Sequence, residues 1–165
     1  MTMEEIDSLT QAQFVATLAG IYENSSWVAE RAWARRPFRA FDNLCAEMQQ
    51  QVELASREEQ LALIRSHPDL GARARVSASS AEEQSSVGLD RLTPEEYDRL
   101  LRLNTAYKQK FDFPFIFAVK GSDKHAILAA LERRLHSAPE EEFAEALRQI
   151  HQIARFRLAA WGKSP

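Results

Sequence analysis

The chain has 165 residues, of which 45% are hydrophobic and 27% are charged, and its formal net charge is −3. These values describe one water-soluble globular domain and argue against a fibre, a disordered tail, a membrane protein or a protein broadly attracted to nucleic acid. A chain of this length buries about two-thirds of the surface that it exposes when unfolded, so its core needs no structural metal or disulfide.

We expect a cytoplasmic protein. No stretch approaches the ~18 consecutive apolar residues of a membrane span. The first ten residues, MTMEEIDSLT, have neither the basic start nor the apolar run of a secretory signal. The last three residues, Lys163-Ser164-Pro165, differ from the Ser-Lys-Leu peroxisomal address.

Apolar residues three and four apart predict amphipathic helices along the first part of the chain. The first helix is predicted to begin at Thr10, which forms a capping-box pattern with Gln13. A second helix follows Ser26 and ends near Pro37. The third carries an apolar stripe that includes Cys45, the only cysteine, so packing explains this residue better than reactivity does.

The fourth predicted helix ends at a proline. Ser56 and Glu59 form its capping-box pattern, and Pro68 forbids its continuation, which places His67 where the helix breaks. The stretch 71–86 has hardly any large apolar side chain. It is predicted to be a surface segment with at most a short helix.

A strong start signal follows at Thr93, where Pro94 occupies the first helical position and Glu96 the third. This helix is predicted to extend to about Lys110. Residues 113–119 are continuously apolar apart from Pro114, a run too short for a membrane span and badly placed for a helix. We expect a buried extended connection.

Two further helices complete the chain. One is capped by Ser122 or Asp123, and the last begins after Ser137 and extends to about Trp161. The sequence therefore predicts an all-α protein of seven or eight helices, folded as a single compact bundle and a single domain over residues 1–165.

Arg157 lies on the apolar stripe of the last predicted helix, at ~100° per residue. A guanidinium there must extend to solvent, pair with a buried carboxylate, or face a cavity that binds an anion or a carbonyl. The sequence leaves these alternatives open.

His67 is a titratable side chain fixed between a helix end and a proline. Histidine suits proton transfer near neutral pH, although a lone histidine is more often an ordinary surface or core residue. The other three histidines, His125, His136 and His151, are expected to be exposed.

Ser80 and Glu83 have the spacing of a capping box, which by itself indicates only that a helix begins. No pair of histidines stands four apart, and no Gly-x-Ser-x-Gly or glycine-rich phosphate loop is present. These observations disfavour a metal site, a serine hydrolase and a nucleotide-binding loop. The arginines at 31, 35, 36 and 39 are interpreted as a solvated face.

Six motifs stand in order along the chain: Ser-His-Pro-Asp-Leu at 66–70, Ser-x-x-Glu-Gln at 80–84, Gly-Leu-Asp at 88–90, Leu-Asn-x-x-Tyr at 103–107, Phe-Pro-Phe-Ile at 113–116 and Arg-Phe-Arg-Leu at 155–158. In order and spacing they resemble the 2-oxo-4-hydroxy-4-carboxy-5-ureidoimidazoline (OHCU) decarboxylase family, whose members catalyse the last step from urate to (S)-allantoin. The resemblance extends from about Phe14 to Trp161.

The resemblance implies a cofactor-free, all-helical and often homodimeric carboxy-lyase that acts on a small molecule, without a metal, a nucleic acid or a membrane. It implies His67 as the catalytic proton donor or acceptor, with Glu83 and Arg157 as its catalytic partners. The substrate-binding residues that it implies are Pro68, Ser80, Ala81, Glu82, Glu83, Gln84, Phe115, Ile116, Phe117, Ala118 and Val119.

Three positions depart from the family pattern. Asp112 stands where glycine is common, Lys120 where arginine is common, and Asn24 where histidine is frequent. These departures bear on loop geometry and substrate fit. Two alternatives stay open: a lyase that acts on a related hydantoin or ureido compound, for which Asp112 and Lys120 would be the cause, and a helical interaction module.

Overall fold

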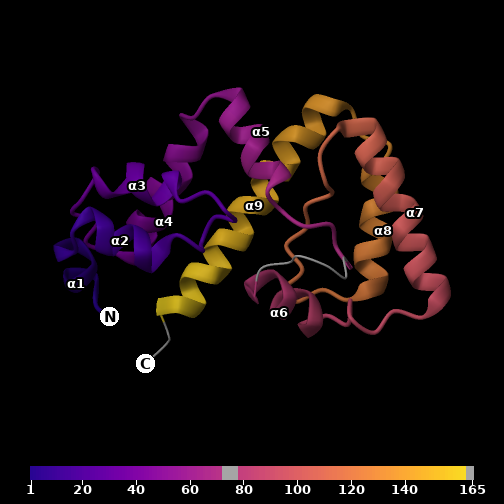
Figure 1. Ribbon diagram of the computed structural model, residues 1–165, viewed down its shortest axis with the longest axis horizontal. Coiled ribbons are helices and arrows are strands. Elements are labelled where there is room, and N and C mark those ends of the chain that lie inside the picture. Colours follow the sequence, from indigo (N-terminus) through magenta and orange to yellow (C-terminus); the bar gives the residue numbers. More distant parts are fainter. Residues whose placement is uncertain (72–77, 163–165) are drawn as a thin grey trace. The chain divides into compact units, whose positions relative to one another are not determined.

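The computed structural model describes residues 1–71 and 78–162, with the side chains of residues 78–80 and 86 outside the description. All regular structure in this part of the chain is helical, which confirms the predicted fold class (Figure 1). The helices are α1 (Met3–Ser8), α2 (Gln11–Leu18), α3 (Trp27–Trp33), α4 (Phe41–Glu53), α5 (Arg57–Arg65), α6 (Ala78–Ser86), α7 (Pro94–Phe111), α8 (Lys124–Arg134) and α9 (Pro139–Gly162). None of these helices is long and apolar enough to cross a membrane.

Side-chain caps set the starts of most of these helices. The capping boxes predicted at Thr10, Ser56 and Thr93 are all formed, and Asp123 caps α8. A fourth box, between Thr2 and Glu5, begins α1. The prediction of seven or eight helices omitted α1, whose six residues bury only Ile6 and therefore give little apolar periodicity.

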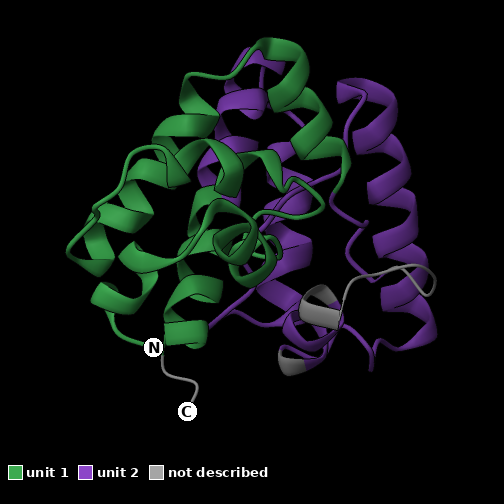
Figure 2. Ribbon diagram, turned by 60° about the vertical axis from the view of Figure 1, so that its left-hand side comes forward, with its two compact units in different colours: residues 1–66, 151–165 green, residues 67–150 purple. Residues whose placement is uncertain are grey.

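The described chain divides into two compact units (Figure 2). Unit 1 comprises residues 1–66 and the chain from His151 onward, and unit 2 comprises residues 67–150. The division falls inside α9, so this one helix contributes to both units.

The core of unit 1 is built where α3 packs against α2 and α4. Its buried side chains include Phe14, Leu18, Val28, Ala32, Leu44 and Met48. Cys45 was predicted on the buried stripe but is only half-buried, because Leu44, Met48 and Val52 define the inner face of α4 and Cys45 lies at its edge.

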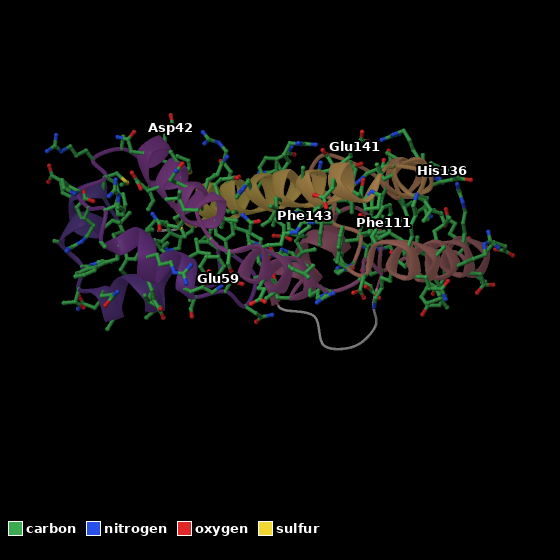
Figure 3. All side chains as sticks on the ribbon, turned by 90° about the horizontal axis from the view of Figure 1, so that it is seen from above. Asp42, Glu59, Phe111, His136, Glu141 and Phe143 are labelled. Carbon is green, nitrogen blue, oxygen red and sulfur yellow. The ribbon has the colours of Figure 1, made fainter. Side chains whose placement is uncertain are left out.

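The core of unit 2 is an aromatic cluster. Tyr107 and Phe111 of α7 contact each other and Phe113. The Phe113 ring packs edge-on against the Phe143 ring of α9, with the two ring centroids 6.2 Å apart. Phe111 and Phe143 lie between α7 and α9 (Figure 3). Residues 113–116 and Val119 are buried and Phe117 and Ala118 are half-buried, so the buried connection predicted over 113–119 is confirmed except at these two residues.

Asp112 ends α7 in the left-handed conformation, with φ 63°. Glycine adopts this conformation without strain, and Asp and Asn are among the few other residues that tolerate it. Asn24 is also left-handed, with φ 47°. Two of the three departures from the family pattern therefore keep a residue type that the backbone accepts.

Gly71 has a positive φ of 75° where the chain leaves the His67 segment. A Cβ atom at this position would lie 2.5 Å from Cδ2 of Leu100, which is itself buried on α7. Both the backbone conformation and the close packing therefore require glycine.

We predict that Gly71→Ala lowers the free energy of unfolding by about 1–3 kcal/mol, since a left-handed backbone strains any residue with a Cβ atom. Urea unfolding followed by circular dichroism measures this difference. Gly20→Ala is the matched control, because its Cβ atom would meet nothing within 4 Å. Equal stability of Gly71→Ala and wild type would contradict the prediction.

Candidate functional site

His67 lies directly after the end of α5, as the sequence predicted. The helix ends at Arg65, Ser66 is its C-cap residue, and Pro68 follows His67. The His67 side chain is buried, with 8% of its surface exposed. An imidazole held in this way has a defined position, which favours a role that depends on orientation over that of a solvated surface residue.

The chain after Pro68 is fixed at three successive residues of unit 2. Lys108 donates from Nζ to Asp69 Oδ2 at 3.3 Å, and Asn104 donates from Nδ2 to the Leu70 carbonyl at 3.1 Å. The Gly71 N–H donates to Gln84 Oε1 at 2.8 Å. Asn104 and Gln84 are both buried, so α7 and α6 hold the segment that follows His67 with bonds shielded from water.

Helix α6 carries the residues predicted at 80–84. Gln84 is buried and Glu83 half-buried, whereas Ala81 and Glu82 are exposed. The side chain of Ser80 lies outside the described residues. The interpretation of Ser80 as a helix cap is wrong, because α6 begins at Ala78 and the Ser80 backbone lies within the helix.

The segment 115–119 is held by side chains of α8 and α9. Arg134 donates from Nη1 to the Ile116 carbonyl at 2.6 Å, and the Ala118 N–H donates to Gln149 Oε1 at 2.9 Å. Phe115, Ile116 and Val119 are buried, while Phe117 and Ala118 are half-buried.

A buried ion pair anchors this segment. Arg134 pairs with Glu142, which is 1% exposed, and Tyr107 Oη donates to the same carboxylate oxygen at 2.6 Å. Burial, with the hydrogen bond to Glu142, raises the pKa of Tyr107, so its hydroxyl stays a donor at neutral pH. Arg134 and Glu142 were not predicted from the sequence. The available signal was that Arg134 follows Ile127 and Leu131 at helical spacing, on the same apolar face.

Arg157 pairs with a buried carboxylate, which is one of the alternatives that the sequence left open. Its Nη1 donates to Glu23 Oε2 at 2.7 Å and to the Gly20 carbonyl at 3.3 Å. The two side chains are 7% and 3% exposed. Arg157 and Glu23 belong to unit 1, whereas His67 and Glu83 belong to unit 2.

Unit 1 also contains a small pocket that the sequence did not reveal. Its lining residues are Ile21, Tyr22, Cys45, Met48, Gln49, His151, Ala154, Arg155 and Leu158. Cys45 and His151 line this pocket, and Glu53 contacts His151. Among the residues that the structure describes, however, no three His, Cys, Asp or Glu side chains are grouped so that they could bind a metal ion.

His151 was predicted to be exposed, and this prediction is wrong. Its side chain is 10% exposed, since Nδ1 is hydrogen-bonded to the Tyr22 hydroxyl at 2.9 Å and Nε2 lies 3.0 Å from Glu53 Oε1. His125 and His136 are exposed as expected. Burial lowers the pKa of His151 below its ordinary 6.5 and outweighs the opposing effect of Glu53.

This pKa shift predicts how His151 contributes to stability. The unfolded chain gains a proton at His151 as the pH falls through 6.5, whereas the folded protein gains it only at a lower pH, so the contribution is present above pH 6.5 and is lost as the pH falls through the lower pKa of the folded state. Tyr22, Glu53, Cys45 and Arg155 are the titratable or charged neighbours, and His151→Gln keeps all four.

We therefore expect His151→Gln to destabilise the protein most above pH 6.5, and less as the pH falls. Unfolding free energies of variant and wild type at several pH values between about 5 and 8 measure this difference. The exposed His136→Gln is the matched control for the loss of a histidine. A difference that grows toward low pH would contradict a neutral His151 in the folded protein.

Comparison with known proteins identifies similar chains along almost the whole length. The family model for OHCU decarboxylase matches residues 7–159. The 2-oxo-4-hydroxy-4-carboxy-5-ureidoimidazoline decarboxylase of Haloferax volcanii is 45% identical over 159 residues, which cover 96% of this chain and 95% of that protein. The uric acid degradation bifunctional protein of Bacillus subtilis is 46% identical, and the match covers 96% of this chain but 32% of that longer protein.

Solved structures show the same fold. The crystal structure of (S)-allantoin synthase matches with a TM-score of 0.79 and 35% sequence identity, covering 98% of this chain and 54% of that one. A crystal structure of OHCU decarboxylase in the presence of (S)-allantoin matches with a TM-score of 0.72. That chain is 22% identical, so it supports the fold alone.

Proposed function

The chain belongs to the OHCU decarboxylase family, and on this premise we propose that it converts 2-oxo-4-hydroxy-4-carboxy-5-ureidoimidazoline to (S)-allantoin and CO2 in urate degradation. The observation that carries the proposal is 45% identity over 95% of the Haloferax volcanii decarboxylase. The bifunctional relative, which is named for uric acid degradation, supports the same pathway.

The proposed substrate needs no electron-accepting cofactor. Its carboxylate and a hydroxyl share ring carbon C4, and the ureido group is on the adjoining carbon C5, which the imidazoline ring joins to nitrogen by a C=N bond. When the bond to the carboxylate breaks, CO2 leaves, the electron pair forms a C4=C5 double bond, and the nitrogen of the C=N bond takes up the electrons of that bond with a proton. The hydroxyl at C4 then loses its proton to become a carbonyl as C5 gains a proton, which gives allantoin. The protein must hold the carboxylate out of the ring plane, stabilise the developing negative charge and deliver the proton to one face of C5.

We assign the proton transfer to His67. Its burial and the proline that follows it fix the imidazole, and histidine exchanges protons near neutral pH. The anchored residues 69–71 support this role, because an imidazole on a fixed backbone meets the same substrate atom in each turnover. Pro68 is proposed to line the substrate site beside it.

Glu83 and Arg157 are the proposed partners of His67. Glu83 would orient the imidazole or a ureido N–H and favour the charged imidazolium. Arg157 would bind a carbonyl or ureido oxygen, with Glu23 orienting its guanidinium. We do not assign Arg157 to the departing carboxylate, because tight binding of that ground-state charge would oppose its loss as neutral CO2.

The remaining proposed substrate-binding residues are those of 80–84 and 115–119. Gln84 and the backbone of Ile116 and Ala118 already make hydrogen bonds within unit 2, which supports a rigid lining in these places. Residues 1–165 are proposed to act as one domain, since the family match spans both units. A cytoplasmic location and a homodimer stay predictions.

The first test is circular dichroism of the allantoin formed when the purified protein meets freshly generated substrate. Spontaneous breakdown protonates either face and gives a racemate. We expect fast formation of optically active (S)-allantoin with the protein and not without it. A wild-type protein that matches the protein-free reaction would contradict the proposed function.

Substitution of the three proposed catalytic residues tests their roles. We expect His67→Ala to fold and to lose about 10²- to 10⁴-fold in kcat, the range for general acid–base catalysis. Glu83→Ala should also fold and lose turnover. Arg157→Lys keeps a cation beside Glu23 but loses the planar fork, for an expected loss of roughly 10- to 100-fold.

Matched controls separate these roles from nonspecific effects. They are His136→Ala, Glu141→Ala and Arg155→Lys, all at exposed positions, of which His136 and Glu141 can be seen in Figure 3. The controls should keep wild-type turnover. Full activity of Glu83→Ala would exclude the proposed orienting role of that carboxylate.

A further inference from the structure

The segment 115–119 is bound by two side chains that the family resemblance does not assign to the site. Arg134 of α8 donates to the Ile116 carbonyl at 2.6 Å, and Gln149 of α9 accepts from the Ala118 N–H at 2.9 Å. Figure 1 shows the connection from α7 to α8 as an extended ribbon. Two bonds therefore fix two alternate residues of an extended chain.

Side-chain packing confirms the two-residue period of this segment. The rings of Phe115 and Phe117 stack with their centroids 6.0 Å apart and their planes 20° apart, so these side chains share a face. In an extended chain, the N–H and C=O of one residue leave on one edge, and those of the next residue leave on the other. The Ile116 C=O and the Ala118 N–H, which bind Arg134 and Gln149, therefore point to one edge of the segment. The Phe117 N–H and C=O point to the opposite edge.

Both anchoring side chains are themselves held in place. The Arg134 guanidinium is bound to the Glu142 carboxylate and lies 4.5 Å from the centroid of the Phe115 ring. Gln149 donates from Nε2 to Glu145 Oε1 at 2.9 Å. Each anchor thus has one bond to the segment and a second bond that restricts its own rotation.

We propose that Arg134 and Gln149 are positioning residues for the decarboxylation, which set the register of segment 115–119 so that the Phe117 N–H and C=O meet the substrate. This inference rests on the proposed function. The substrate fits this arrangement because its urea and ring amide units place a C=O beside an N–H. One peptide edge with an N–H and a C=O side by side can pair with such a unit through two hydrogen bonds.

Gln149→Met is the sharpest test, since methionine keeps the length and volume of the side chain but cannot accept the Ala118 N–H. We expect KM to rise roughly five- to ten-fold with kcat little changed, the pattern for loss of a contact made equally in the ground and transition states. A merely structural role would reduce the fraction of active enzyme and leave KM unchanged. Gln152→Met, the same change at an exposed position of α9, is the matched control.

A double substitution tests for rescue. Glu145→Gln combined with Gln149→Glu exchanges the two partners, so that position 149 still accepts from Ala118 and position 145 supplies the amide donor. We expect this swap to restore KM toward the wild-type value. Arg134→Lys tests the second anchor, because a lysine retains the charge opposite Glu142 without the fork that also reaches Ile116. We expect KM to rise here too.

The outcomes distinguish the inference from the function on which it rests. A wild-type protein that gives no optically active allantoin would overturn both. An active wild type with an unchanged KM in Gln149→Met, or a swap variant as impaired as Gln149→Met, would overturn the role of Gln149 alone. An unchanged KM in a folded Arg134→Lys variant, with folding checked by thermal melting, would overturn the role of Arg134.

Discussion

The buried pair of Arg134 and Glu142 joins the three helices of unit 2 that surround segment 115–119. Two charges taken out of water are tolerated only when their other polar atoms are also bonded, and removal of one partner from such a pair costs about 3–5 kcal/mol. Here Tyr107 of α7 donates to the carboxylate, and the guanidinium donates to the Ile116 carbonyl. Three helices and the connection between two of them are therefore arranged around one charge pair.

Helix starts were predictable from the sequence because they depend on local bonds. The boxes at Thr10, Ser56 and Thr93 each join residues three apart, and Pro94 at the first helical position strengthens the last. Local rules failed where the pattern was ambiguous or too short. Ser80 and Glu83 have the spacing of a box inside a helix that has already begun at Ala78, and α1 buries a single residue.

The candidate site shows the same division between local and long-range information. The position of His67 follows from a helix end and a proline, both visible in the sequence, whereas its burial was not predicted. The partner of Arg157 could not be predicted from the sequence, because Glu23 lies 134 residues away and nothing local distinguishes it from the other carboxylates of the chain. His151 was misjudged for the same reason, since its burial depends on Tyr22 and Glu53, which are distant in the chain.

The course of the chain has a consequence for synthesis on the ribosome. Unit 2 interrupts unit 1, whose last part begins only at His151. Residues 67–150 therefore all emerge before Ala154 and Leu158, which line a pocket with Ile21 and Met48. Because domains fold as units during translation, the first 66 residues must keep apolar surface unburied while unit 2 is completed. Residues 1–66 therefore finish folding only after the chain from His151 onward has been made, and until then apolar side chains such as Ile21 and Met48 lack part of their packing.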